Sequence, residues 1–257
     1  IKKYKELLDA GRIDGCTEYG ISVKIMMPIT KPAFASMAIL CAMGSWNNML
    51  WPMLVFRDTS KFTLQIGLNT LLAVADAIKE EKYRIRAGRI IDHVIGWASA
   101  NDWRIPEHFT KEWKADLDCN KECPADRFKP YGATPGHGIE WARLITQWAL
   151  ANCGEEKEKL ENYLQAAENL YTTAIKDGWD ADGAPGIVYT TDWNGKPVVH
   201  DRMHWTLAEA INTSAVLYHV TGKEKYAKDY AEFMKYLDEV VMDHENGSWF
   251  HQLDANN

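Results

Sequence analysis

The sequence predicts an all-α protein made of two parts that differ in character. Three observations support this: a charge-free apolar run near the N-terminus, helical spacing of apolar residues in the remainder, and a weak internal repeat there. Charge is divided unevenly, with 8 Lys and Arg against 5 Asp and Glu in residues 1–70, and 21 against 31 in residues 71–257. We therefore expect a boundary near residue 70.

The composition of the 257 residues excludes several classes of protein. Hydrophobic residues make up 46% and charged residues 25%, which excludes a disordered or low-complexity chain. A net charge of −7 argues against nucleic acid as a main partner. The five cysteines are scattered and odd in number, which favours a reducing compartment. The eleven tryptophans fit either sugar binding or ordinary core packing.

Residues 32–56 contain no charged side chain, and Lys31 and Arg57 bracket them. The run is long enough for a transmembrane helix, which needs about 20 mostly apolar residues. Its second half is interrupted by Ser, Asn and Pro, so a buried helix of a soluble domain is the alternative. A signal peptide is not expected, because the run begins too late. Membrane residence would require this run to insert, whereas residues 71–257 are expected to be cytoplasmic.

Residues 7–34 read LLDAGRIDGCTEYGISVKIMMPITKPAF. An Asp-Gly pair, Asp14 and Gly15, allows a turn between two short helices, and a Pro-x-x-x-Pro spacing follows. Together with the continuation GSWNNMLWPMLVFRDTSKFTLQIGLNT, the segment resembles the cytoplasmic coupling loop and following helix of sugar ABC transporter permeases. The resemblance covers residues 1–70. It implies docking of residues 7–32 on an ATPase subunit, although a single membrane span cannot form a transport pathway.

Five segments after residue 71 have apolar residues at helical spacing. They are residues 83–98, 139–151, 157–176, 205–220 and 224–242. A further helix is expected before Lys79, and Gly178 is expected to end the third segment. The weak repeat consists of AVADAIKEEKY at 73–83 and AVLYHVTGKEKY at 215–226. It predicts helical hairpins arranged as a stack or a toroid.

Residues 99–136 show little periodicity and are expected to form a long functional loop. The loop leads into RFKPYGATPGHGIEWARL, which places His137 near the start of a helix. The positive helix end is expected to lower the imidazole pKa and keep the ring neutral, able to accept a proton. Glu140 lies three residues on, on about the same helical face. The two are candidates for acid–base catalysis; the alternative is that His137 caps the helix and Glu140 is solvated.

Two further clusters contain candidate residues. HDRMHWTLAEAI places Arg202 and His204 before Trp205 at a helix start, where Trp205 could equally belong to the core. ENGSWFHQLD combines an Asn-Gly turn with a short extended run. Cys119 and Cys123 have no second pair of zinc ligands nearby, so no metal site is expected.

A resemblance to a second family is carried by RFKPYGATPGHGIEW, by GIVYTTDWNGKPVVHDRMHW with the LAEAI after it, and by DHENGSWFHQLDANN. These segments are similar to the N-acylglucosamine 2-epimerase superfamily, in particular to its aldose–ketose isomerases for mannose-like or sulfoquinovose-like hexoses. The resemblance covers residues 71–257 and implies an (α/α)6 toroid with the site in its central funnel. It also implies proton transfer between C1 and C2 of an open-chain monosaccharide through a cis-enediol, without cofactor or metal.

The same resemblance implies roles for individual residues. His137 matches a catalytic general acid/base, and Glu140 matches a residue that contacts the substrate and positions that histidine. The remaining matches are expected to bind substrate: Arg127, Trp205 and Glu209. His251 departs from the family pattern and is not expected to be catalytic.

The family pattern extends beyond this chain. A second catalytic histidine would fall just past Asn257, and the first half of the toroid would stand where the permease-like segment lies. We therefore expect about half of the toroid and little or no isomerase activity. Three functions stay open: a sugar isomerase or 2-epimerase, a truncated permease of a carbohydrate transporter, and a fusion that links isomerisation to import. A chimera of two genes would mimic all three.

Overall fold

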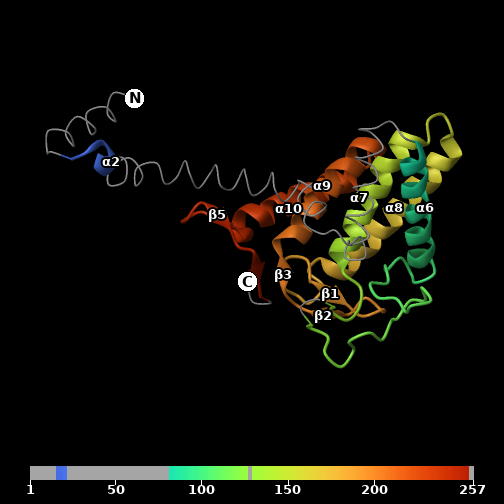
Figure 1. Ribbon diagram of the computed structural model, residues 1–257, viewed down its shortest axis with the longest axis horizontal. Coiled ribbons are helices and arrows are strands. Elements are labelled where there is room, and N and C mark those ends of the chain that lie inside the picture. The colour runs from blue at the N-terminus through green and yellow to red at the C-terminus, as the bar shows by residue number, and fades with distance from the viewer. Residues whose placement is uncertain (1–15, 22–80, 127–128, 255–257) are drawn as a thin grey trace. The chain divides into compact units, whose positions relative to one another are not determined.

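A computed structural model of the chain describes residues 16–21, 81–126 and 129–254 (Figure 1). Contacts divide the chain into two compact units, Ile1–Val74 and Ala75–Asn257. The second unit contains every candidate residue of the expected sugar site, and its fold is what positions them.

The described part of the first unit contains one short helix, α2 (Glu18–Ile21). The coupling-loop candidates Asp14 and Gly15 lie outside the described residues, and so does the charge-free run 32–56. Where the chain is described, no helix is both long enough and apolar enough to cross a membrane. The prediction of a membrane helix therefore stays a prediction.

The described part of the second unit is mostly helical. Its helices are α6 (Glu81–Ser99), α7 (Pro135–Asn152), α8 (Lys157–Gly178), α9 (His204–Thr221) and α10 (Glu224–Tyr236), followed by the π-helix η3 (Leu237–Val241). All five predicted helices are confirmed. Four have ends within about one turn of those expected, whereas the fifth, predicted to run to residue 242, ends as an α-helix at Tyr236 and continues as the π-helix η3. The long loop predicted after the first of them is also confirmed, since no helix interrupts the described residues between α6 and α7. The helix expected before Lys79 lies outside the described residues.

Helix α7 forms the centre of the helical packing. It packs against both α8 and α9, and α10 packs against α9 (Figure 1). The apolar face expected from the sequence is buried, with Trp141, Leu144, Ile145 and Trp148 all at most 7% exposed. Burial of each such side chain contributes about 1.5–3 kcal/mol, so this helix is held firmly in place.

The first turn of α7 lies very close to its neighbours because small residues permit it. A Cβ atom at Gly136 would lie 2.6 Å from Thr206 and 2.7 Å from the ring of Trp205. A Cβ atom at Gly178 would lie 2.8 Å from the Cβ of Pro135. The start of α7 is therefore in direct contact with the start of α9 and the end of α8.

Three antiparallel two-stranded ribbons complete the described part of this unit. They are β1 (Thr190–Thr191) with β2 (Pro197–Val199), β3 (Arg202–Met203) with β6 (Gln252–Leu253), and β4 (Met242–Asp243) with β5 (Ser248–Trp249). Ala133, just before α7, bridges to Thr191, so the first ribbon lies at the end of the helices where α7 begins. The Asn-Gly turn predicted near the C-terminus is confirmed: Gly247 has φ 75°, and its N–H donates to Asp243 O at 2.8 Å.

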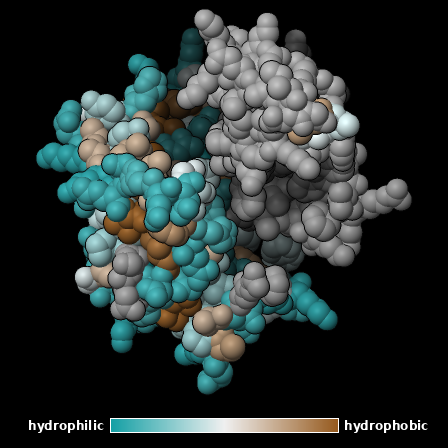
Figure 2. All heavy atoms as spheres, turned by 90° about the vertical axis from the view of Figure 1, so that its left-hand side faces the viewer, coloured by the Kyte–Doolittle hydropathy of each residue, from teal (hydrophilic) through white to brown (hydrophobic). Residues whose placement is uncertain are grey.

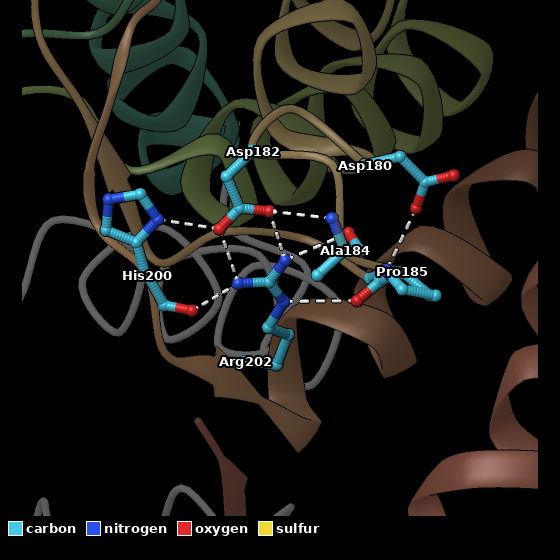
Figure 3. A network of polar contacts seen from close by, with 7 residues as sticks. Asp180, Asp182, Ala184, Pro185, His200 and Arg202 are labelled. Atoms are coloured by element: carbon cyan, nitrogen blue, oxygen red, sulfur yellow. Dashed lines mark hydrogen bonds and ion pairs between the residues drawn. The ribbon is translucent and has the colours of Figure 1, made fainter. Parts of the chain in front are cut away.

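A buried ion pair fixes the chain just before α9. Arg202 is 3% exposed, and its guanidinium donates to both carboxylate oxygens of Asp182, at 2.5 and 2.8 Å (Figure 3). It also donates to the carbonyl oxygens of Ala184, Pro185 and His200. The guanidinium holds the pKa of the Asp182 carboxyl well below its usual range. Arg202 thus ties the loop after α8 to the strand that leads into α9.

Some large apolar side chains stay exposed. They are Ile85, Trp113, Leu150, Tyr218, Tyr230, Met234, Met242, Trp249 and Phe250. Among the described residues that Figure 2 colours, apolar patches interrupt a mainly hydrophilic surface. The most exposed of these side chains, Trp113 at 67%, lies parallel to Trp97 with ring centroids 6.3 Å apart. Single apolar side chains of this kind are ordinary on protein surfaces.

Candidate active site

His137 lies in the first turn of α7, as predicted. The helix begins at Pro135, a position that suits proline because its fixed φ is already helical and the backbone N–H that it lacks is not needed there. The N-cap is Thr134 rather than His137, and its carbonyl accepts the backbone N–H of His137 at 3.0 Å. The interpretation of His137 as the helix cap is therefore wrong. Its side chain is 29% exposed and free to act on a ligand.

The imidazole of His137 is paired with Glu107. Its Nδ1 lies 2.9 and 3.0 Å from the two carboxylate oxygens, and the Glu107 side chain is only 17% exposed. An ionised carboxylate only accepts hydrogen bonds, so Nδ1 carries the hydrogen. In the neutral ring, Nε2 is then the nitrogen that can accept a proton. This is the arrangement in which a carboxylate orients a histidine base.

The sequence did not single out Glu107. It lies 30 residues before His137, so no local spacing links the two. Its one sequence signal is its place in the long irregular loop 99–136, which the sequence marks as functional. Only the folded loop brings the two side chains together.

The pKa of His137 is raised, not lowered as expected from the helix end. Burial is the largest single effect on this pKa and lowers it, because burial favours the neutral ring. The carboxylates of Glu107, Glu140 and Glu209 raise the pKa and together outweigh burial. The expectation was wrong because it considered only the helix that carries the histidine. Two of these three carboxylates come from other elements. A raised pKa increases the protonated share of the imidazole at any given pH.

Glu140 is half-buried next to His137, rather than fully solvated. Burial raises the pKa of its carboxyl, and the nearby Glu209 carboxylate raises it further, while His137 and Arg143 act in the opposite direction. The negative charge of Glu209 disfavours ionisation of Glu140. Glu140 can therefore take up a proton more readily than an ordinary glutamate.

Arg143 and Glu209 join α7 to α9 across the site. The guanidinium donates from Nε and Nη2 to the two carboxylate oxygens, at 2.9 and 3.0 Å. The side chains are 14% and 22% exposed, so the pair is partly protected from water. Nη1 of Arg143 also donates to Gln147 at 3.2 Å. Glu209, a predicted substrate-binding residue, is thereby held in one orientation.

Trp205 is the aromatic wall beside the histidine. Its ring centroid lies 5.3 Å from that of His137, with 33° between the planes. The side chain is half-buried, which leaves part of the ring exposed. Arg127, the remaining predicted substrate-binding residue, lies outside the described residues. The structure thus brings together His137, Glu140, Trp205 and Glu209, and adds Glu107 and Arg143.

His204, from the second candidate cluster, is in contact with His251, which is not expected to be catalytic. The ring centroids of His204 and His251 are 4.6 Å apart, and Nδ1 of His204 lies 3.0 Å from the carbonyl oxygen of His251. Burial lowers the pKa of His204. Within residues 16–21, 81–126 and 129–254, no three His, Cys, Asp or Glu side chains are grouped as metal ligands would be.

The chain shows similarity to proteins of known families over most of its length. A family model described as "N-acylglucosamine 2-epimerase (GlcNAc 2-epimerase)" matches residues 64–257. A D-mannose isomerase of Pseudomonas cannabina pv. alisalensis is 42% identical over 187 residues, which are 72% of this chain and 45% of that protein. A crystal structure of a D-mannose isomerase aligns with a TM-score of 0.67 and 31% identity, covering 75% of this chain and 49% of that one.

The N-terminal part has a different set of relatives. The arabinooligosaccharide transport system permease protein AraQ of Halalkalibacterium halodurans is 63% identical over 68 residues, which are 26% of this chain and 24% of the permease. Both resemblances found in the sequence are thus confirmed. The chain spans less than half the length of each of these relatives.

Proposed function

The chain belongs to the N-acylglucosamine 2-epimerase family, and from this premise we propose that residues 71–257 act on an open-chain hexose by proton transfer between C1 and C2. The observation that carries the proposal is the pair of His137 and Glu107 at the start of α7, beside Trp205. Mannose is the proposed substrate, because relatives that are 42% and 39% identical are D-mannose isomerases.

The chemical step follows from the free Nε2 of His137. In an open-chain aldose the C2–H bond lies next to the C1 carbonyl, which makes its proton acidic. Neutral His137 removes that proton at Nε2, and the electron pair of the C2–H bond forms the C1=C2 bond of a cis-enediolate. Return of the proton to C1, with transfer of the O2 proton to O1, gives the ketose. Return to the opposite face of C2 gives the epimer.

The neighbouring carboxyl groups have separate tasks in this proposal. Ionised Glu107 orients the imidazole through Nδ1–H and stabilises the imidazolium that forms when Nε2 takes the proton. Glu140, on the helix turn next to His137, contacts the sugar and helps to hold that histidine in position, as the family resemblance implies; burial and Glu209 raise the pKa of its carboxyl. Neither task requires a metal or a cofactor.

The remaining residues hold the sugar. The exposed part of the Trp205 ring packs against a sugar face, as aromatic side chains do with apolar C–H surfaces. Glu209, oriented by Arg143, accepts a hydrogen bond from a hydroxyl group, and Arg127 is assigned to a second hydroxyl by the family resemblance. The site lies in the part of an (α/α)6 toroid that α6–α10 make up.

Exchange of the C2 hydrogen tests this assignment directly. The full chain is incubated with D-mannose in heavy water, and loss of the H2 signal is followed by NMR. Because little or no net isomerisation is expected of half a toroid, the test follows exchange alone. We expect slow exchange with the natural chain, loss of exchange with His137→Ala, and the same slow exchange with the control His219→Ala, an exposed histidine of α9. Exchange that survives in His137→Ala would remove this histidine from its proposed role.

A second candidate function concerns residues 1–70. The 63% identity to a permease favours a membrane component of a carbohydrate transporter, in which residues 7–32 contact an ATPase subunit and residues 32–56 insert. Membrane fractionation of cells that produce the chain tests this proposal. Retention in the membrane pellet after an alkaline carbonate wash is expected if the run inserts, and full release into the supernatant would contradict it.

A further inference from the structure

A polar pocket outside the His137 site is formed by three separate segments of the chain. It has a volume of about 340 Å³. Its walls come from the loop after α6, from the last turns of α8, and from the turn between β1 and β2. The lining side chains used below are Asp102, Arg104, Lys176, Asp177, Trp193 and Asn194. This volume falls in the range of small-molecule sites.

The floor of the pocket is an ion pair that is almost buried. Arg104 Nε donates to Asp177 at 2.7 Å, and the two side chains are 11% and 6% exposed. Arg104 uses only this one of its side-chain nitrogens in a hydrogen bond within the described chain. Its terminal nitrogens are left as donors at the pocket wall. An arginine fixed in this way presents donors without further loss of side-chain entropy.

The turn between β1 and β2 is fitted closely onto this ion pair. Gly195 has φ 83°, and a Cβ atom there would lie 2.5 Å from Asp177 and 2.8 Å from Arg104. The indole N–H of Trp193 donates to Leu117 O at 2.6 Å, which fixes the ring at the edge of the pocket. Since its N–H is already used, the ring offers a ligand its apolar surface.

The charges around the pocket indicate an uncharged ligand. Two cationic side chains, Arg104 and Lys176, face two carboxylates, Asp102 and Asp177. The formal charge is therefore balanced, and nothing in the lining selects for an ion. The amide of Asn194 adds a donor and an acceptor. A sugar matches this lining, because its hydroxyl groups both donate and accept while its C–H face packs on an aromatic ring.

We propose that this pocket is a second binding site for a neutral sugar, separate from the His137 site. None of its lining residues belongs to the group formed by Glu107, His137, Glu140, Arg143, Trp205 and Glu209. Binding here does not require the proposed proton transfer, so the inference stands or falls independently of it.

Methyl α-D-mannopyranoside is a suitable probe, because its blocked C1 prevents ring opening and hence turnover. Its binding to the full chain is measured by isothermal titration calorimetry and ligand-observed NMR. We expect Trp193→Ala and Asn194→Ala each to weaken binding about tenfold, while Trp193→Phe, which keeps an aromatic ring, weakens it less. In His137→Ala, binding at this pocket is expected to change by less than about twofold.

Three results would overturn the proposal. The first is no binding of the glycoside to the natural chain. The second is binding that Trp193→Ala and Asn194→Ala leave intact but Trp205→Ala abolishes, which would place the probe only in the His137 site. The third is tighter binding of free glycine, a zwitterion, than of the glycoside, with both lost in Asn194→Ala, which would show that the pocket selects a charged ligand. Circular dichroism and C2 exchange, both expected to be unchanged in Asn194→Ala, show whether the variant is still folded.

Discussion

Replacing Glu107 by Gln removes the negative charge beside His137 and keeps the shape of the side chain. In the natural chain both carboxylate oxygens lie within 3.0 Å of Nδ1, and both side chains are less than a third exposed. A hydrogen bond between charged groups contributes about 1.5–3 kcal/mol, and a neutral one about 0.5–1.5 kcal/mol. We therefore expect Glu107→Gln to lower the free energy of unfolding by about 1 kcal/mol when His137 is protonated.

The loss is expected to depend on pH. The folded-state pKa of His137 lies above its ordinary value of 6.5. Its pairing with Glu107 therefore contributes fully to the free energy of unfolding at pH values below the ordinary pKa of 6.5. This contribution is lost as the pH rises through the folded-state pKa. Urea unfolding of the natural chain and of Glu107→Gln should differ more at pH 5 than at pH 9. NMR titration should show a lower pKa for His137 in the variant, because a carboxylate that raises it has been removed.

The same substitution should slow C2 exchange on mannose. Loss of the group that orients a histidine base and stabilises its protonated form costs about 100-fold or more in rate. The matched control is Glu112→Gln, which changes an exposed glutamate in the same loop. Equal destabilisation at both pH values, or an unchanged pKa for His137, would refute the reasoning about this pair.

Three further predictions concern the frame of the site. Glu209→Gln should lower the free energy of unfolding by about 2 kcal/mol, because it leaves the partly buried guanidinium of Arg143 without its charged partner. Urea unfolding measures this loss, and a loss below about 0.5 kcal/mol would contradict the prediction. Gly136→Ala should displace Trp205 and cost about 1–3 kcal/mol, detectable as a change in tryptophan fluorescence and a lower thermal midpoint. Arg202→Met should cost about 3 kcal/mol at neutral pH, because it leaves the nearly buried Asp182 carboxylate without its arginine partner, although His200 Nδ1 still lies 2.6 Å from it. Since that carboxylate has a depressed pKa, its stabilising contribution is present above its ordinary pKa and falls away in acid, so the natural chain and Arg202→Met should converge in stability as the pH falls.

The helices could be predicted because their signals are local. Apolar residues at helical spacing identify α6 to α9 within about one turn and α10 except for its last residues, which form the π-helix η3. The buried face of α7 follows from Trp141, Leu144, Ile145 and Trp148. The three short ribbons were harder to predict, apart from the turn at Gly247. Strands of two or three residues carry almost no periodic signal, and their pairing joins segments as distant as β3 and β6.

By itself the sequence determined the helical fold, the likeness to two families, and the position of His137 at a helix start, because each is encoded in neighbouring residues. Only the tertiary structure decided which charges surround that histidine. Glu107 comes from 30 residues away and Glu209 is held by Arg143 across 66, so a reading of α7 alone gave the wrong direction for the histidine pKa. The pocket around Arg104 and Asp177, 73 residues apart, is likewise a product of folding. The energy of an electrostatic interaction depends on the distance between the charges. For residues far apart in the sequence, tertiary packing sets that distance.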